Sequence, residues 1–171
     1  MNHVVLYQPE IPQNTGNIMR TCVAVNAKLH LIEPLGFSLD EKHIKRSAAN
    51  YMEHLNYEVY PNIEAFFEKN KGEYYFLTRY GQQAPSAFDY QDTHQERYFI
   101  FGSESSGMPK ELLQDHLDRC FRLPMSGHIR SMNLSNVVAI IMYEVMRQQD
   151  YHGLEAFEPE HFKGKDYLKS K

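Results

Sequence analysis

The sequence contains few cysteines, no tryptophan and no long apolar run. Its two cysteines, Cys22 and Cys120, lie far apart and in no ligand-like spacing, which excludes a disulfide scaffold and indicates free, buried thiols. The nine histidines show no HxxxH spacing, so the sequence predicts no metal site. No apolar stretch approaches the roughly 18 residues of a membrane-spanning helix, and Met1 to Tyr7 lacks the basic region of a signal peptide. We therefore expect a cytoplasmic protein that holds no metal and contacts no membrane.

What is present suits one globular domain. The chain has 171 residues, of which 42% are hydrophobic, close to the norm for a protein with a single core. The formal net charge of −4 argues against a nucleic-acid binder, but binding needs only a local basic patch. Two clusters could supply one, although each also suits a solvated helix face or a frayed tail. They are Lys42, His43, Lys45 and Arg46, and Lys163, Lys165, Lys169 and Lys171.

Strand-like and helix-like segments alternate along the chain. This alternation predicts an α/β fold with a mostly parallel sheet and helices on both faces. Asn14 or Thr15 is expected to cap the first helix, and Asp40 the second. Strands are expected at His3–Tyr7, Lys28–Ile32, Tyr57–Tyr60, Tyr74–Thr78, Arg97–Phe101 and Arg119–Leu123. Helices are expected at Thr15–Asn26, Asp40–Tyr51, Ile63–Lys69, Lys110–His116 and Leu134–Gln149.

The last of these helices is apolar nearly all round, with Ser131 or Asn133 as its N-cap. A helix of this kind must be covered on both sides, so we predict that a second subunit covers one of them. A central core helix would give the same pattern. One apolar stripe is Leu134, Val138, Ile141 and Val145, and the other is Val137, Ile140, Met142, Tyr143 and Met146.

Three segments place Gly, Asn, Ser and Arg where predicted strands end, the edge at which open α/β sheets bind ligands. The first runs from Asn14 to Arg20 and opens a helix, whose free N–H groups attract anions. The second runs from Gly102 to Gly107. The third, Ser131 to Asn136, holds more polar residues than one helix cap needs. An ordinary capped helix or glycine turn remains the alternative reading of each segment.

The second segment has the glycine spacing of a phosphate-binding loop but not its chemistry. Met108-Pro109 stands where a Walker site has Lys followed by Ser or Thr, so that site is excluded. No GxGxxG occurs, which leaves a dinucleotide site unsupported. The remaining interpretation is a tight loop at Gly102 that lets a ligand approach the backbone, with Glu104 available for hydrogen bonding.

Together with the opening of the chain, these segments resemble the SPOUT superfamily of RNA methyltransferases, and within it the TrmL (YibK, CspR) group. The resemblance rests on Leu6 to Asn17, Ile32 to Phe37 and Ser131 to Asn136, in the right order and spacing. It implies a single methyltransferase domain over residues 1–171, with a motif-bearing core over about 1–151 and a C-terminal tail over 152–171. It also implies a deep trefoil knot in the last third of the chain, an exception to the rule against threaded connections.

The resemblance further implies that S-adenosylmethionine binds in the knot and leaves as S-adenosylhomocysteine. The family site is built across a homodimer. By position, the catalytic residues are Asn14, Arg20, Ser131 and Asn133. The residues that would contact the cofactor are Leu77, Thr78, Gly102, Glu104, Gly107, Leu123, Met125, Ser131 and Met132.

The activity implied is transfer of a methyl group to the ribose 2′-hydroxyl of cytidine or uridine 34, the wobble nucleotide, in the anticodon stem-loop of tRNA-Leu species. An rRNA 2′-O-methyltransferase of the same fold is one alternative, and an added RNA-binding domain would be expected there. A non-catalytic S-adenosylmethionine- and RNA-binding module is another, for which loss of Arg20 or of the asparagines would be expected. A flavodoxin-type nucleotide-binding domain would need a stronger phosphate loop after the first strand than Asn14 to Asn17 offers.

Overall fold

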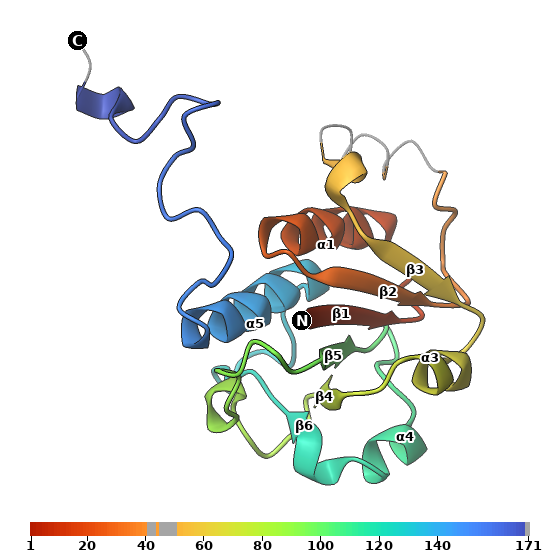
Figure 1. The fold of residues 1–171 in the computed structure, drawn as a ribbon. Coiled ribbons are helices and arrows are strands. Elements are labelled where there is room, and N and C mark those ends of the chain that lie inside the picture. The colour runs from red at the N-terminus through yellow and green to blue at the C-terminus, as the bar shows by residue number, and fades with distance from the viewer. Residues whose placement is uncertain (41–43, 45–50, 170–171) are drawn as a thin grey trace.

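The computed structural model describes residues 1–40, 44 and 51–169, and they form one six-stranded sheet (Figure 1). Every strand pairs in parallel with its neighbours, in the order β3-β2-β1-β5-β4-β6. The predicted α/β architecture is therefore confirmed. The strands are β1 Asn2–Tyr7, β2 Lys28–Ile32, β3 Tyr57–Tyr60, β4 Glu73–Leu77, β5 Arg97–Phe101 and β6 Cys120–Phe121. The helices named here are α1 Pro12–Ala24, α3 Ile63–Lys69, α4 Lys110–Gln114 and α5 Leu134–Gln148.

Helices cover both faces of the sheet, as Figure 1 shows. On one face α1 and α5 pack together over the larger core, to which β1 contributes Val4 and Leu6. On the other face α3 and α4 cover a smaller core that includes Val5 of β1 and Phe66 of α3. Neighbouring strand residues point to opposite faces, so β1 supplies both cores, and its consecutive residues Val4, Val5 and Leu6 are all apolar.

Several predicted boundaries differ from the structure by one to three residues, and two of the differences have a clear cause. The first helix begins at Pro12 and not at Thr15, and its N-cap, Ile11, makes no side-chain hydrogen bond. Proline favours the first helical position because its fixed φ suits a helix and its missing N–H is not needed there. Asn14 and Thr15 are thus inside the helix and do not cap it. The last strand is also shorter than predicted, because it pairs with β4 only over Cys120 and Phe121.

One predicted feature cannot be compared with the structure. The middle of the expected helix between Asp40 and Tyr51 lies outside the described residues, apart from Ile44, which is helical and buried. The basic cluster Lys42, His43, Lys45 and Arg46 also lies outside them.

The long helix α5 is capped by Asn133, whose Oδ1 accepts from the backbone N–H of Ser135 at 3.0 Å. Its first predicted stripe packs in the core, as do Val137, Met142 and Met146 of the second. Ile140 and Tyr143 differ, because they are 42% and 46% exposed. The second stripe is therefore divided between the core and the surface.

A chain of buried polar groups crosses the smaller core, from His3 near the start of β1 to Tyr60 at the end of β3. Nδ1 of His3 lies 2.9 Å from Nε2 of His30, and Nδ1 of His30 lies 3.0 Å from the hydroxyl of Tyr60. The other ring nitrogen of His3 lies 2.5 Å from a carboxylate oxygen of Glu96. Burial lowers the pKa of His30 to about 3 and also lowers the pKa of His3, so both rings are neutral near pH 7.

Candidate active site

A cavity of about 710 Å³ opens at the carboxyl ends of β4, β5 and β6 and reaches the start of α5. This volume lies in the range of small-molecule sites. Asn14, Ser131 and Asn133, three of the four predicted catalytic residues, line the cavity. So do all the predicted cofactor contacts, namely Leu77, Thr78, Gly102, Glu104, Gly107, Leu123, Met125, Ser131 and Met132. The three segments selected in the sequence thus meet at one place, although contact with a cofactor stays a prediction.

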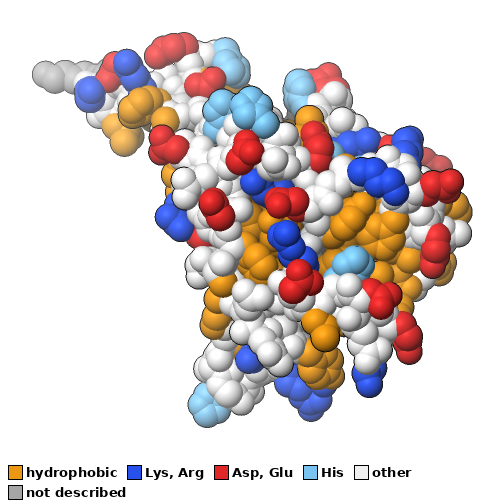
Figure 2. Space-filling view, turned by 60° about the horizontal axis from the view of Figure 1, so that its bottom comes forward, with side chains coloured by type: hydrophobic (Ala, Val, Ile, Leu, Met, Phe, Trp, Pro, Cys, Tyr) orange, Lys and Arg blue, Asp and Glu red, His pale blue; other side chains and the backbone are white. Residues whose placement is uncertain are grey.

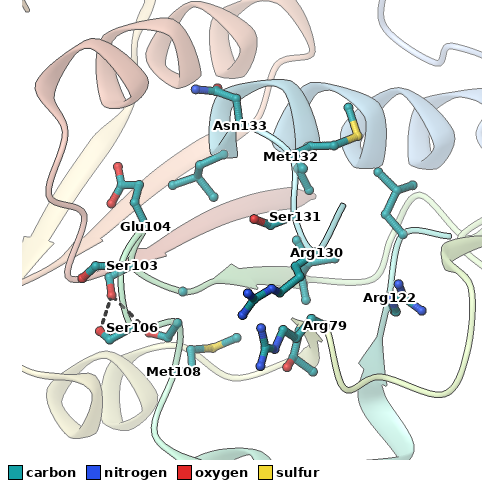
Figure 3. A pocket seen from close by; sticks show the side chains of 18 of the residues that line it. Arg79, Ser103, Glu104, Ser106, Met108, Arg122, Arg130, Ser131, Met132 and Asn133 are labelled. Atoms are coloured by element: carbon teal, nitrogen blue, oxygen red, sulfur yellow. Dashed lines mark hydrogen bonds between the residues drawn. The ribbon is translucent and has the colours of Figure 1, made fainter. Parts of the chain in front are cut away.

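The loop after β5 is closed by its own hydrogen bonds. The backbone N–H groups of Ser103 and Gly107 each donate to the other's carbonyl, at 3.1 and 3.0 Å, and the hydroxyls of Ser103 and Ser106 lie 2.7 Å apart (Figure 3). Gly107 has a φ of +66°, which favours glycine. A Cβ on Gly102 would lie 2.5 Å from the carbonyl carbon of Gly107. Only glycine at position 102 therefore permits this closed loop.

Glu104 attaches the β5 loop to the segment that leads into α1. One carboxylate oxygen accepts from the backbone N–H of Glu10 at 2.9 Å. The other accepts from the backbone N–H of Ile11 at 3.2 Å and from Nδ2 of Asn14 at 3.3 Å. Both oxygens thus engage the protein itself. The structure favours a role for Glu104 in holding the rim of the cavity, in addition to the cofactor contact predicted from the sequence.

Asn14 continues this connection to the third segment. Its Oδ1 accepts from Nδ2 of Asn133 at 3.0 Å, while Oδ1 of Asn133 caps α5 through Ser135. Asn14 is buried, so both polar ends of its amide need partners inside the protein, and Glu104 and Asn133 supply them. The result is a continuous series of hydrogen bonds across the three segments.

The loops after β4 and β6 form the opposite wall. The backbone N–H of Thr78 donates to the carbonyl of Phe121 at 3.0 Å, and that of Arg122 donates to Gln83 at 2.8 Å. A Cβ on Gly81 would lie 2.3 Å from the carbonyl carbon of Phe121, which shows how closely the two loops approach. Leu77 and Leu123 are thereby held on the same side of the cavity.

Three arginines in the cavity lining were not singled out from the sequence. Arg79 comes from the loop after β4, whereas Arg122 and Arg130 both come from the loop that joins β6 to α5. Figure 3 shows Arg79 and Arg130 reaching into the same part of the cavity. Guanidinium groups suit carboxylates and phosphates, which they can bind through two hydrogen bonds. A basic residue directly before Ser131 was the available signal, but the spacing alone did not say that it would face inward.

Arg20, the fourth predicted catalytic residue, does not line this cavity. It is exposed on α1, and its guanidinium carbon lies 5.8 Å from the centre of the Tyr51 ring. Within one chain the structure therefore separates Arg20 from Asn14, Ser131 and Asn133.

Some other chemistries find no support. Among residues 1–40, 44 and 51–169, no group of three His, Cys, Asp or Glu side chains could hold a metal ion. Both cysteines are buried, and burial raises the pKa of the Cys22 thiol to about 12, so this thiol is a poor nucleophile. Across the same described residues, no helix has the length and apolar character needed to span a membrane.

Comparison with known proteins gives consistent matches over most of the chain. Residues 1–143 match the SpoU rRNA Methylase family. A relative from Bacillus subtilis (strain 168) is 54% identical over 154 residues, which cover 90% of this chain and 96% of the relative. A tRNA (cytidine(34)-2′-O)-methyltransferase from Escherichia coli (strain K12) is 42% identical over 156 residues, covering 90% of this chain and 97% of that protein.

Solved structures also resemble the chain over most of its length. One that concerns the 2-OH methylation of C/U34 on tRNA superposes with a TM-score of 0.81 at 36% identity. It covers 89% of this chain and 98% of the other. The shared architecture is the parallel sheet that carries the cavity described above.

Proposed function

The chain belongs to the SpoU rRNA methylase family, and on that premise we propose that it transfers a methyl group from S-adenosylmethionine to the ribose 2′-hydroxyl of nucleotide 34 in tRNA. The names of the Escherichia coli relative and of the 36% identical structure support this reaction and this position. Since tRNA is cytoplasmic, the protein would act there. We further propose tRNA-Leu species as substrates and a knotted chain path around the cofactor.

The observation that carries the proposal is that Asn14, Glu104 and Asn133 are joined by hydrogen bonds at the edge of one cavity. Gly102 and Gly107 line the same cavity. Nothing lies within 4 Å of where a Cβ of Gly107 would stand, so a ligand can approach the backbone closely there, which suits a cofactor held largely by main-chain groups. Gly102 makes room for the backbone of Gly107 and so keeps the loop closed. Arg79, Arg122 and Arg130 add positive charge, which suits the carboxylate of the cofactor or a phosphate of the RNA.

S-adenosylmethionine, when bound, supplies a methyl group already activated by its sulfonium. The protein therefore needs to position the ribose and to ease loss of the hydroxyl proton. Asn133 lies at the start of α5, where its amide can orient the ribose while Asn14 holds the amide in place. An arginine is a poor base at neutral pH, so we assign Arg20 to a phosphate contact and to stabilisation of the developing alkoxide.

We propose that the protein acts as a homodimer. Arg20 is outside the cavity of its own chain, so a second copy must supply it. Ile140 and Tyr143 form an exposed apolar stripe on α5, on the same layer as α1. Covering this stripe with a second copy would remove apolar surface from water. Each cavity would then be completed by an arginine from the other protomer.

The test uses purified protein, isotope-labelled S-adenosylmethionine and total tRNA from a strain that lacks the gene. We expect label in the ribose of nucleotide 34, identified by nucleoside digestion and mass spectrometry. Label on a base would contradict the proposed chemistry. The same assay with rRNA in place of tRNA tests the alternative substrate. Label in rRNA but not in tRNA would overturn the assignment to tRNA.

A further inference from the structure

The chain after α5 leaves the domain and forms an extended arm, here defined as residues 155–169 (Figure 1). Contacts with the body are made just before it. Leu154 packs against the larger core, and Nδ2 of Asn26 donates to the carbonyl of Gly153 at 3.0 Å. Within the arm, backbone turns are local, for example from Phe162 and Gly164 to Pro159. The arm thus keeps a defined shape without resting on the sheet.

The direction in which the arm leaves is set by an unusual backbone. Asp150 and Tyr151 both have positive φ, +50° and +53°, and Gly153 follows at +79°. Consecutive non-glycine residues in this region are strained and persist only when other contacts impose them. Here the backbone N–H of Tyr151 donates to the carbonyl of Met146 at 2.8 Å, which anchors the turn to α5. The fold therefore holds the base of the arm in one orientation.

The arm exposes large apolar side chains to a degree that is rare on a globular surface. Phe157 is 72% exposed, Phe162 is 69% exposed and Leu168 is 92% exposed. Single exposed apolar residues are normal, but a series of them on a projecting segment marks a contact surface. Figure 2 shows hydrophobic and basic side chains gathered together near the end of this projection.

Charge separates the arm into two halves. The first half carries Glu155, Glu158 and Glu160. The last ten residues of the chain hold four lysines and one aspartate, so they carry +3, while the other 161 residues carry −7 of the total of −4. A local positive excess of an acidic protein is thus placed on a projecting segment.

The basic half has the pattern expected of a segment that binds RNA. Phe162, Lys163, Lys165 and Tyr167 interleave rings with cations, and Nζ of Lys163 lies 4.5 Å from the centre of the Tyr167 ring. Lysines bind phosphates, and aromatic rings stack on unpaired bases whatever their sequence. We propose that residues 162–169 bind the RNA substrate outside the target nucleotide, an inference that rests on the proposed function.

This contact would lie well away from the site of methyl transfer in the same protomer. The cavity is at the beginning of α5, and the arm starts after its end, so about 22 Å of helix separates them at 1.5 Å per residue. The arm should therefore strengthen RNA binding without taking part in the chemistry. The interleaving of aromatic rings with lysines favours RNA over a second copy of this chain, because unpaired bases can stack on the rings while phosphates pair with the lysines.

The experiment measures binding of an anticodon stem-loop RNA in the presence of S-adenosylhomocysteine, over a range of salt concentrations. We expect the double variant Lys163→Gln/Lys165→Gln to bind about fivefold or more weakly, and its slope of log affinity against log salt to fall by roughly 1.5. Phe162→Ala should weaken binding by a similar factor with an unchanged slope. Matched controls are Phe157→Ala in the acidic half and Lys71→Gln/Lys110→Gln on the body, which should bind as the parent does.

Methyl transfer and assembly are measured on the same variants. We expect KM for tRNA to rise and kcat to stay unchanged. Affinity and salt slope equal to those of the controls would overturn the proposal, and so would a variant lacking residues 155–171 that weakens dimerisation but not RNA binding. Failure of the parent protein to methylate nucleotide 34 would refute the proposed function alone, because the binding assay requires no catalysis.

Discussion

The amide of Asn133 donates to the amide of Asn14 at 3.0 Å, joining the start of α5 to the first turn of α1 across 119 residues of sequence. The same Asn133 caps α5 through its Oδ1, so one side chain performs two separable tasks. The link to Asn14 depends on the Nδ2 donor of Asn133, and the cap of α5 depends on its Oδ1 acceptor. This division allows the catalytic arrangement to be tested apart from helix stability.

Asn133→Asp keeps the acceptor and removes the donor. We expect the cap to be kept, because aspartate caps a helix as well as asparagine does, while the buried Oδ1 of Asn14 loses its donor, which costs about 1–3 kcal/mol, and kcat falls at least tenfold. Asn133→Ala should lose the cap as well, which costs about 1 kcal/mol more. Urea unfolding and single-turnover methyl transfer measure the two effects. Equal kcat for Asn133→Asp and the parent would show that the link is unimportant.

Substitution of Gly102, which lines the cavity, can be compared with substitution of Gly127, which is not among the lining residues. A Cβ at position 102 would meet the backbone of Gly107 at 2.5 Å, whereas a Cβ at position 127 would have nothing within 4 Å. We expect Gly102→Ala to lower the affinity for S-adenosylhomocysteine at least tenfold, because the β5 loop must move aside. Gly127→Ala should bind like the parent. Calorimetric titration measures both, and equal affinities would place the cofactor elsewhere.

Arg20 can be tested by mixing two inactive variants. At an S-adenosylmethionine concentration well below the Kd of Gly102→Ala, the variants Arg20→Ala and Gly102→Ala are each expected to be inactive alone, since one lacks the arginine and the other binds no cofactor. If the site is shared between protomers, subunit exchange creates heterodimers with one intact site, and about a quarter of the parental activity should return. No recovery, with exchange verified by native mass spectrometry, would mean that each chain uses its own Arg20.

Arg20→Lys tests the role of the side chain itself. Lysine keeps the charge but cannot form two parallel hydrogen bonds to a phosphate. We expect kcat/KM to fall by about one to two orders of magnitude, with the affinity for S-adenosylhomocysteine unchanged. Retention of most activity would contradict the proposed bidentate contact.

Much of the fold could be predicted because it follows from local patterns. The apolar strands, the start of α5 at Asn133 and the bounds of α3 are properties of neighbouring residues. The segments of the site were found because strand ends in a parallel sheet meet at one edge. The cap of α1 was wrong because Pro12 can start a helix without a side-chain cap, which frees Asn14 for a distant partner.

The remainder of the site depends on tertiary contacts that leave no local pattern. The carboxylate of Glu104 accepts hydrogen bonds from the backbone N–H groups of Glu10 and Ile11, more than 90 residues away in the sequence. No rule of residue spacing predicts hydrogen bonds over such a distance in the chain. Arg79, Arg122 and Arg130 lie on loops, where no helical or strand period sets the direction of a side chain. Their convergence depends on how the loop after β4 approaches the loop that joins β6 to α5.

The buried pair His3 and His30 predicts a loss of stability in acid. Both pKa values are lowered in the folded protein, while an unfolded histidine titrates near 6.5. Above pH 6.5 the two histidines are neutral in both the folded and the unfolded protein, so their titration does not lower the free energy of unfolding. As the pH falls below 6.5 the unfolded state binds protons that the folded state cannot, so stability decreases, and for His30 the decrease continues toward its folded pKa of about 3.

We expect His30 to account for about 2 kcal/mol of destabilisation between pH 7.5 and pH 5, an order-of-magnitude figure for a group that is fully buried. Urea unfolding at the two pH values measures it. His30→Gln should be less stable at pH 7.5, since Tyr60 and His3 lose a ring partner, but its stability should depend less on pH. His128→Gln, an exposed control, should keep the parental dependence. If His30→Gln and the parent lost the same stability on acidification, other groups would be responsible, and the two histidine rings would titrate alike in the folded and unfolded states.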